Sequence, residues 1–343
     1  MRSNVFPDEY HDRNGVLFPR DADQHRAMSG ETEIEKKIAD IVSSSNDVSS
    51  LSTELRSRIE DHATLYEFSP KRNNLLRPLS GLLKGKILEI GAGTGAITRF
   101  LGESGAEVIG VERSSTRAAI ARSRNRDLGN VRLVSDDIEN ISFRQKFDVV
   151  TLIGAVGHRN AFELSPELLS IARRNLKDGG TFVLAMENQL GLKYFAGAKE
   201  DDWPSPFIGI NDQLERSVGF ALGRTELRTM LAEAGFKSLS WFYPFPDFRL
   251  PTTILSEAAF QNPGAHDLSP LFSGSNFDDP KGARPGTFSL DRAWGLIARN
   301  GLAEDLANSF LIVCRTSDAG SRAPAAGDKA IAWHYSVDRK SVV

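Results

Sequence analysis

The sequence is short of cysteine: Cys314, inside the apolar run SFLIVC, is the only one in 343 residues. A single cysteine excludes an intramolecular disulfide, and its apolar neighbours predict a buried structural thiol. Nowhere do His, Cys, Asp and Glu residues adopt the spacing of a metal-ligand cluster. We therefore expect neither a disulfide scaffold nor a metal site.

Long apolar runs and long runs of one charge are missing too. No stretch is long enough to cross a bilayer, and the first residues contain no apolar leader segment. The formal net charge is -3 and there is no long basic block, which argues against nucleic acid as the main partner. These absences predict a soluble cytoplasmic protein with no membrane span.

Composition divides the chain into four segments. Residues 1–30 are polar and lack periodicity, which predicts a flexible arm, whereas residues 31–80 have helix-like apolar spacing. Residues 81–316 alternate strand-like and helix-like runs and are predicted to form the main domain. Residues 317–343 begin with a small-residue linker, after which IAWHYSVDRK looks like the opening of a strand in another domain. The chain would then be a shortened relative or a fragment of a longer protein.

The main domain has the pattern of a Rossmann-like α/β fold. Its first five apolar runs, separated by helix-like runs, are KILEIG, EVIGVE, VRLVSDD, FDVVTLIG and TFVLAME. This alternation predicts right-handed crossovers and a parallel sheet with helices on both faces. Two later runs, SLSWFYP and SFLIVC, complete a predicted seven-stranded, mostly parallel sheet. Residues 188–222 and 245–290 are the predicted cap insertions, the second a long one before the last strand.

A glycine-rich turn, EIGAGTGA at residues 89–96, joins the first strand to a helix. Glycines let a ligand approach the main chain, and the helix N-terminus behind them offers free amides. The turn fits G-x-G-x-x-[GA], which holds the pyrophosphate of a dinucleotide, and equally E-x-G-x-G-x-G, which resembles a methyltransferase motif. Glu112 ends the next strand, 21 residues beyond Gly91, where a carboxylate can accept ribose hydroxyls in either case. The turn and this carboxylate leave both cofactors open.

The residues around the turn resemble the class I S-adenosylmethionine-dependent methyltransferases in an ordered set of motifs. VRLVSDDIENISF ends its strand in acidic residues, FDVVTLIGAVGH resembles motif IV, and NLKDGGTFVLA matches the signature ahead of the fifth strand. The resemblance covers residues 60–315 approximately. It implies the class I methyltransferase fold and S-adenosyl-L-methionine as cofactor, in preference to a dinucleotide oxidoreductase.

The resemblance also implies roles for particular residues. Asp137, with Asp136 as the alternative, would accept the adenine amino group, and the backbone amide of Ile138 would meet a ring nitrogen. Arginine pairs bidentately with carboxylates, and the candidates for the methionine carboxylate ahead of the first strand are Tyr66, Arg72 and Arg77. The predicted cofactor-binding set is Glu89, Gly91, Ala92, Gly93, Gly95, Glu112, Arg113, Asp136, Asp137, Ile138, Ile153, Tyr66 and Arg77.

Methyl transfer to a hydroxyl requires alignment of the reactants and removal of a proton, so a general base is expected. His158 ends motif IV, where the resemblance places a histidine beside the sulfonium. The alternative is a helix-start histidine bonded to a backbone carbonyl. Glu187 ends the fifth strand at the edge where open α/β sheets bind ligands. It is predicted to act as the base, to hold the acceptor, or to cap the next helix.

Two stretches carry a narrower resemblance. ENQLGLKYFAGAKED and WFYPFPDFRLPTTILSE are similar to segments of bacterial methyltransferases associated with surface polysaccharide synthesis, often fused to or encoded beside glycosyltransferases. The chain departs from that pattern at GAVGH and at Asp202 and Trp203. The resemblance implies O-methylation of a sugar hydroxyl, with glycosyltransferases as partners. The predicted substrate-binding residues are Asn188, Lys193, Tyr194, Tyr243, Asp247 and Arg249.

Two other functions stay open on the sequence. One is a small-molecule or lipid O- or N-methyltransferase with the same cofactor site. The other is a non-catalytic domain that binds the cofactor or serves as a scaffold, because a fold does not guarantee an activity.

Overall fold

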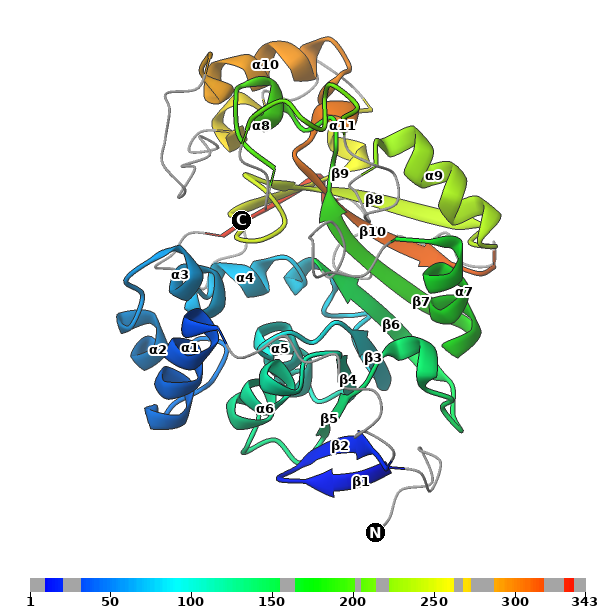
Figure 1. The fold of residues 1–343 in the computed structure, drawn as a ribbon. Helices are drawn as coiled ribbons and strands as arrows, with labels where there is room; N and C mark the ends of the chain where they lie inside the picture. The colour runs from blue at the N-terminus through cyan, green and yellow to red at the C-terminus, as the bar shows by residue number, and fades with distance from the viewer. Residues whose placement is uncertain are drawn as a thin grey trace.

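The computed structural model describes residues 10–20, 32–154, 164–200, 205–213, 222–261, 268–272, 287–317 and 330–335 (Figure 1). The strands are β1 (Tyr10–Arg13), β2 (Val16–Pro19), β3 (Lys86–Ile90), β4 (Glu107–Glu112), β5 (Val131–Ser135), β6 (Phe147–Ile153), β7 (Leu176–Glu187), β8 (Ser238–Phe245), β9 (Thr253–Ser256), β10 (Ser309–Arg315) and β11 (Ala332–His334). The α-helices are α1 (Glu33–Ser44), α2 (Thr53–Ser57), α3 (His62–Phe68), α4 (Lys71–Asn74), α5 (Ala96–Glu103), α6 (Ser115–Arg124), α7 (Pro166–Asn175), α8 (Leu192–Phe195), α9 (Arg224–Glu233), α10 (Leu290–Arg299) and α11 (Ala303–Leu306). Short 3-10 helices are η1 (Arg77–Leu79), η2 (Ile138–Asn140), η4 (Glu257–Ala259) and η5 (Ser269–Phe272).

The described strands form one sheet with the order β1-β2-β5-β4-β3-β6-β7-β10-β8-β9-β11. The pairs from β2 to β7 along this order are parallel, and the others are antiparallel. All seven predicted strands are present and occupy the middle of the sheet. The prediction of seven mostly parallel strands was nevertheless wrong in the number of strands and in the share of parallel pairs. The segments that were predicted to be an arm, an insertion and a tail add strands at both edges.

The N-terminal edge comes from a hairpin in the segment that was predicted to be a flexible arm. Asn14 and Gly15 have φ angles of 55° and 81°, the left-handed backbone that a tight two-residue hairpin turn requires. Asp12 accepts a 2.8 Å hydrogen bond from the Gly15 amide, and Val16 of β2 pairs in parallel register with Leu133 of β5. The Asn-Gly pair followed by VLF was the sequence signal for this hairpin.

The opposite edge includes the C-terminal run that was predicted to belong to another domain. Trp333 of β11 pairs with Ile254 of β9 and is only 7% exposed. Its ring lies 5.8 Å from that of Phe242 in β8. Residues 332–334 therefore belong to the same sheet, and the Trp333 side chain completes one core of the domain. The division of the chain into domains stays a prediction.

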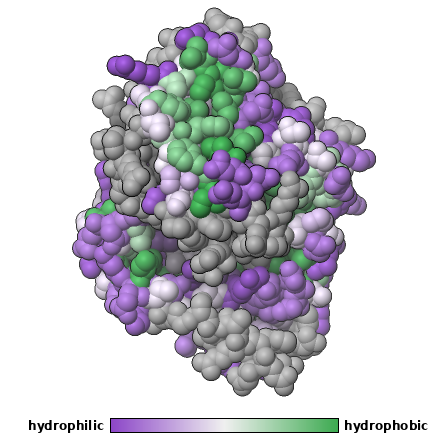
Figure 2. Space-filling model, turned by 45° about the horizontal axis from the view of Figure 1, so that its top comes forward, coloured by the Kyte–Doolittle hydropathy of each residue, from purple (hydrophilic) through white to green (hydrophobic). Residues whose placement is uncertain are grey.

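Residues 188–200 and 287–308, here called the cap, lie at the carboxyl end of β7 and carry α8, α10 and α11 (Figure 1). The Thr287 amide donates a 2.9 Å hydrogen bond to the Ala196 carbonyl, which joins the two halves of the cap. Figure 2 shows hydrophobic residues gathered on the upper part of the molecule, where the cap lies. The exposed large hydrophobic residues of the cap are Leu190, Phe195, Phe288, Leu296 and Leu302.

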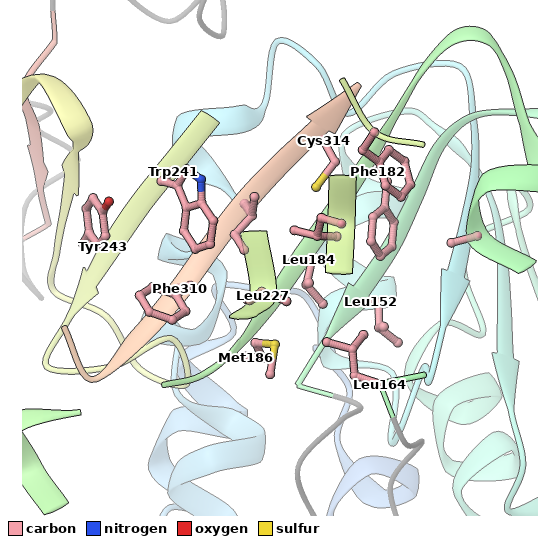
Figure 3. Packing of buried hydrophobic residues seen from close by; sticks show 14 of the residues in the cluster. Leu152, Leu164, Phe182, Leu184, Met186, Leu227, Trp241, Tyr243, Phe310 and Cys314 are labelled. Atoms are coloured by element: carbon pink, nitrogen blue, oxygen red, sulfur yellow. The ribbon is translucent and has the colours of Figure 1, made fainter. Parts of the chain in front are cut away.

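Helices cover both faces of the sheet, as predicted. Side chains alternate along each strand, so Leu88 and Ile90 of β3 enter one core with α7 and α9, whereas Ile87 enters the other with α5 and α6. Figure 3 shows the first core, in which Phe182 of β7 lies near Cys314 of β10. The Cys314 side chain is fully buried, and burial raises the pKa of its thiol. The predicted structural thiol is therefore confirmed.

The segment before β3 contains several helices, the first of which, α1, packs against α6. Ile38 and Ile41 of α1 share a small core with Ile120 of α6. Glu35 of α1 also accepts a 2.7 Å hydrogen bond from Arg117 of α6. In the described part of the chain, no helix combines the length and the apolar character needed to cross a membrane.

Candidate functional site

The glycine-rich turn lies where β3 ends and α5 begins, at the carboxyl edge of the parallel strands. Gly91, Gly93 and Gly95 have φ angles of 78°, 55° and 86°, a backbone that other residues rarely adopt. A Cβ on Gly95 would lie 2.8 Å from the Ala121 backbone, so this glycine allows α5 and α6 to pack closely. A Cβ on Gly93 would meet nothing within 4 Å among the described residues. The turn is therefore closed towards the helices and open at Gly93.

Glu112 at the end of β4 holds the turn in this shape. Its Oε2 accepts a 2.8 Å hydrogen bond from the Gly93 amide, and its Oε1 accepts one of 2.9 Å from the Ser114 amide. Each carboxylate oxygen can accept more than one donor. The predicted ribose carboxylate is thus fixed beside the open side of the turn, with acceptor capacity left over.

Glu89 lies beneath the turn and is 2% exposed. Its Oε2 is buried and has no hydrogen-bond partner among the described residues. Burial raises the pKa of Glu89 to about 8; the Thr98 hydroxyl and the charge of Arg72 oppose the rise, and the charge of Glu112 adds to it. A buried carboxyl oxygen without a donor is unfavourable on its own. This side chain fits a site that receives a cationic or hydrogen-bonding ligand group.

The loop after β5 contains both aspartates proposed for the adenine. Asp136 is occupied by protein groups: its Oδ1 accepts from the Asp137 amide at 2.7 Å and its Oδ2 from Tyr10 at 2.6 Å. Asp137 forms a 3.0 Å ion pair with Arg113 through Oδ2, whereas its Oδ1 is buried without a partner in the described chain. The geometry therefore favours Asp137 over Asp136 as the ligand. Ile138 is buried at the start of η2.

The three candidates for the methionine carboxylate lie in different places. The Arg72 guanidinium stacks 3.8 Å from the ring centre of Tyr66, and its Nε is buried without a partner among the described residues. Arg77 instead faces the ring of Tyr335 at 5.4 Å, on the side of the C-terminal strand. The structure thus places Tyr66 and Arg72 together near Glu89 and sets Arg77 apart.

Ile153 ends β6, and the Gly154 that follows has a φ angle of 64°. A Cβ on Gly154 would lie 2.7 Å from the ring of Phe248 and 3.8 Å from the Tyr66 hydroxyl. Two aromatic side chains therefore meet the chain just after β6, one from α3 and one from the segment after β8. His158 lies outside the described residues, as do Asp202 and Trp203.

A buried ionic group, here called the Glu187 network, joins the end of β7 to the segment after β8. Glu187 Oε1 accepts hydrogen bonds from Lys193 at 2.6 Å and from Arg249, and its Oε2 accepts one of 2.8 Å from Tyr194. Asp247 lies 3.6 Å from Lys193 and 3.7 Å from Arg249. Four of the six predicted substrate residues thus converge on Glu187, from two segments that lie far apart in the sequence.

The charges of this network hold Glu187 as a carboxylate. Burial would raise the pKa of Glu187, but Arg249 and Lys193 hold it well below its usual range. A base with a depressed pKa and three donors already on its oxygens is poorly suited to take a proton at neutral pH. The geometry favours a role for Glu187 in holding the acceptor side of the site together.

The other two predicted substrate residues lie apart from this network. Asn188 is fully buried, and its side-chain amide donates to the carbonyls of Asp305 and Ala307, both at 2.7 Å. The Tyr243 hydroxyl donates a 2.8 Å hydrogen bond to Glu304, which also pairs with Arg224. Asn188 therefore ties β7 to the cap, and Tyr243 belongs to a separate ionic cluster behind it.

Sequence reasoning missed several contacts that link the site to its surroundings. The Asn74 side chain of α4 donates a 2.9 Å hydrogen bond to the Pro251 carbonyl, and the Thr94 hydroxyl of the glycine turn donates to Glu67 of α3. Phe248 was not proposed for the site either. The only signal was the dense polar run SPKRNNLLRPL, in which two adjacent asparagines interrupt an apolar helix pattern.

Comparison with known proteins agrees with this geometry. Residues 87–180 match the family described as "Methyltransferase domain". Demethylmenaquinone methyltransferase of Tropheryma whipplei (strain Twist) is 31% identical over 173 residues, covering 46% of this chain and 68% of that protein. Ubiquinone biosynthesis O-methyltransferase of Pseudomonas aeruginosa is 28% identical over 142 residues, covering 38% of this chain and 57% of that protein. The chain thus spans little more than half the length of the Pseudomonas relatives that it matches.

A solved structure of Haemonchus contortus phosphoethanolamine N-methyltransferase 2 in complex with S-adenosyl-L-methionine covers 73% of this chain and 53% of that one. Its identity is 17% and its TM-score 0.44, so it adds nothing to the assignment.

The glycine turn at the carboxyl edge of a parallel sheet, with Glu112 beside it, defines an α/β domain that binds a nucleotide-containing cofactor. The chain belongs to the class I S-adenosylmethionine-dependent methyltransferases, as the Tropheryma relative shows. S-adenosyl-L-methionine is the cofactor of this family, which confirms the cofactor predicted from the motifs and closes the dinucleotide alternative. Among the described residues, one oxygen each of Glu89 and Asp137 has no partner and the space at Gly93 is open, which fits this cofactor.

Proposed function

We propose that the protein transfers a methyl group from S-adenosyl-L-methionine to a hydroxyl acceptor. The observation that carries this proposal is the open side of the glycine turn at Gly93, together with one buried oxygen each of Glu89 and Asp137 that has no hydrogen-bond partner among the described residues. When bound, the cofactor supplies an electrophilic methyl group on a sulfonium. Glu112 would hold the ribose hydroxyls, Asp137 the adenine amino group, and Arg72 with Tyr66 the amino-acid end.

On the acceptor side, the protein has to align a hydroxyl with the methyl group and keep water out. The Glu187 network fixes the segment of residues 245–250 against the end of β7, and Arg249 also lies 5.0 Å from the ring centre of Phe248. Phe248 in turn packs on Gly154, beside the predicted sulfonium position. In this proposal Glu187 is a positioning residue. His158, four positions beyond Gly154, is the proposed base that takes the hydroxyl proton.

A sugar hydroxyl is the first proposed acceptor. Support comes from the two stretches that resemble the polysaccharide-associated methyltransferases, because Glu187 and Lys193 of one contact Arg249 and Asp247 of the other. Glycosyltransferases of a polysaccharide assembly system are the proposed partners.

An apolar acceptor is the second candidate, and the cap favours it. Five large hydrophobic side chains of the cap are exposed, with Leu296 at 58% and Leu302 at 49%. Monomeric proteins seldom leave contiguous apolar surface without a use. One relative is named a ubiquinone biosynthesis O-methyltransferase and the other a demethylmenaquinone methyltransferase. An acceptor with an apolar part, such as a quinone precursor or a lipid-linked sugar, would suit this surface.

Two measurements test the proposal in order. Calorimetry with S-adenosyl-L-methionine and S-adenosylhomocysteine should give micromolar binding, which Gly93→Val and Glu112→Ala should abolish. Absence of binding at millimolar concentrations would overturn it. Methyl-labelled cofactor with nucleotide sugars, glycans or quinone precursors should then label one acceptor class. Binding without labelling of any class would favour the non-catalytic alternative.

A further inference from the structure

Tyr10, the first residue of β1, reaches the loop that follows β5. Its hydroxyl donates a 2.6 Å hydrogen bond to Asp136 Oδ2, across 126 positions of sequence. The hairpin is brought there by β2, whose Val16 lies opposite Leu133 of β5 in parallel register. The Tyr10 ring also packs against the core that contains Ile138. Ring packing and strand pairing together fix the direction in which the hydroxyl points.

Asp136 transmits this contact to the rest of the loop. Its Oδ1 accepts from the Asp137 amide at 2.7 Å and from the Asn140 side chain at 3.2 Å. With Tyr10 on Oδ2, both oxygens of Asp136 are engaged by the protein. The Asp136 carboxylate therefore links residues 136, 137 and 140 of the loop. Its orientation depends on the hydrogen bond from the Tyr10 hydroxyl.

The next residue, Asp137, is left with one oxygen to offer. Arg113 pairs with Oδ2 at 3.0 Å, while Oδ1 is buried without a hydrogen-bond partner in the described chain. Leaving such an oxygen unpaired is unfavourable unless a ligand donor meets it. A small rotation of the Asp136–Asp137 peptide would turn Asp137 Oδ1 away from the ligand's hydrogen-bond donor.

We propose that Tyr10 is a positioning residue of the cofactor site: through Asp136 it fixes the 136–140 loop so that Asp137 Oδ1 faces the adenine amino group. The N-terminal hairpin is thereby part of the cofactor site and not only an edge of the sheet. This inference rests on the proposed cofactor binding and adds to it a determinant of selectivity for the adenine 6-amino group.

The test is a ratio of two affinities measured by calorimetry on the full chain. S-adenosylhomocysteine carries the 6-amino group, and S-inosylhomocysteine replaces that group with a carbonyl oxygen. Wild type should prefer the first ligand. Tyr10→Phe, which keeps the ring but removes the hydroxyl, should weaken S-adenosylhomocysteine binding three- to tenfold and leave S-inosylhomocysteine binding unchanged. The preference then falls by the same factor.

Asp12→Ala is the matched control, because it removes one hydrogen bond from the turn of the same hairpin, at the Gly15 amide, without touching the loop. Its preference should equal that of wild type. The inference is overturned if Tyr10→Phe keeps the wild-type preference, or if Asp12→Ala lowers the preference as much, which would indicate a general structural role. Wild type that binds neither ligand would overturn the proposed function, a result distinct from both.

Discussion

Removal of the charge of Glu187 should make the protein unfold at a much lower denaturant concentration than wild type. The side chains of Glu187, Lys193, Asp247 and Arg249 are 10%, 3%, 5% and 13% exposed, so two cations and two anions share a nearly dry site. Glu187→Gln keeps the shape of the side chain but leaves the site with one uncompensated positive charge. Loss of one partner from a buried ion pair costs about 3–5 kcal/mol. The slight exposure of Arg249 places the expected loss at the lower end, about 3 kcal/mol.

Urea unfolding followed by circular dichroism measures this loss, and an exposed pair provides the control. Lys36 and Glu33 lie 2.9 Å apart, but their side chains are 49% and 90% exposed. Glu33→Gln should change the free energy of unfolding by less than about 0.5 kcal/mol, because solvent screens such pairs. A loss of less than about 1 kcal/mol in the free energy of unfolding for Glu187→Gln, at an unchanged denaturant slope, would refute the view that the buried Glu187 network stabilises the fold.

The pH dependence gives an independent check. Arg249 and Lys193 hold the pKa of Glu187 well below its usual range in the folded protein, despite burial, which opposes them. A carboxylate with a depressed folded pKa stabilises the protein fully above its unfolded pKa, about 4.3, and loses this contribution as pH falls through the folded pKa. The difference between wild type and Glu187→Gln should therefore be flat from pH 8 to about pH 5 and shrink below about pH 4. A difference that changes between pH 6 and pH 8 would contradict the assigned pKa direction and revive Glu187 as a base.

Three further predictions concern the cofactor side. Because burial raises the pKa of Glu89 to about 8, folding stability is lost as pH rises from about 4 towards 8; Glu89→Gln should therefore raise the melting temperature of the ligand-free protein at pH 8 while weakening cofactor binding, and an unchanged melting temperature would contradict this. Arg72→Gln should weaken S-adenosyl-L-methionine binding about tenfold in calorimetry, whereas Arg77→Gln, whose arginine faces Tyr335, should leave binding within about twofold; equal effects would place both arginines at the ligand. His158→Ala should leave binding of S-adenosylhomocysteine unchanged and slow turnover at least tenfold, and a full rate would remove this histidine from the mechanism.

The sequence predicted the middle of the fold because that part depends on local patterns. Apolar runs separated by amphipathic helices define parallel crossovers, and the glycine turn requires the positive φ angles found at Gly91, Gly93 and Gly95. The order of the acidic strand ends, Glu112 and then Asp137, also follows from the order of the strands. For these elements the position of a residue in the sequence determines its position at the edge of the sheet.

The edges of the sheet and the partners of the polar side chains depend on contacts over long sequence separations. β2 pairs with β5, and β11 with β9, over long sequence separations, so their short apolar runs carry little signal by themselves. Similarly, nothing near Arg77 in sequence shows that Tyr335 lies opposite it. The partners of Asn188 could not be predicted for the same reason, because its acceptors, at Asp305 and Ala307, lie more than a hundred positions away.

The Glu187 network changes what the acceptor site can use for recognition. Lys193, Tyr194, Asp247 and Arg249 were expected to touch the acceptor, yet their polar atoms satisfy one another around Glu187 and the first three are no more than 3% exposed. A ligand that bound these groups directly would have to break buried ion pairs, and the free-energy cost would exceed the gain from the new contacts. Their contribution is therefore to fix Phe248 and the base of the cap. We therefore propose that the more exposed surface of the cap recognises the acceptor; there Phe195 is 39% exposed immediately beside the buried Tyr194.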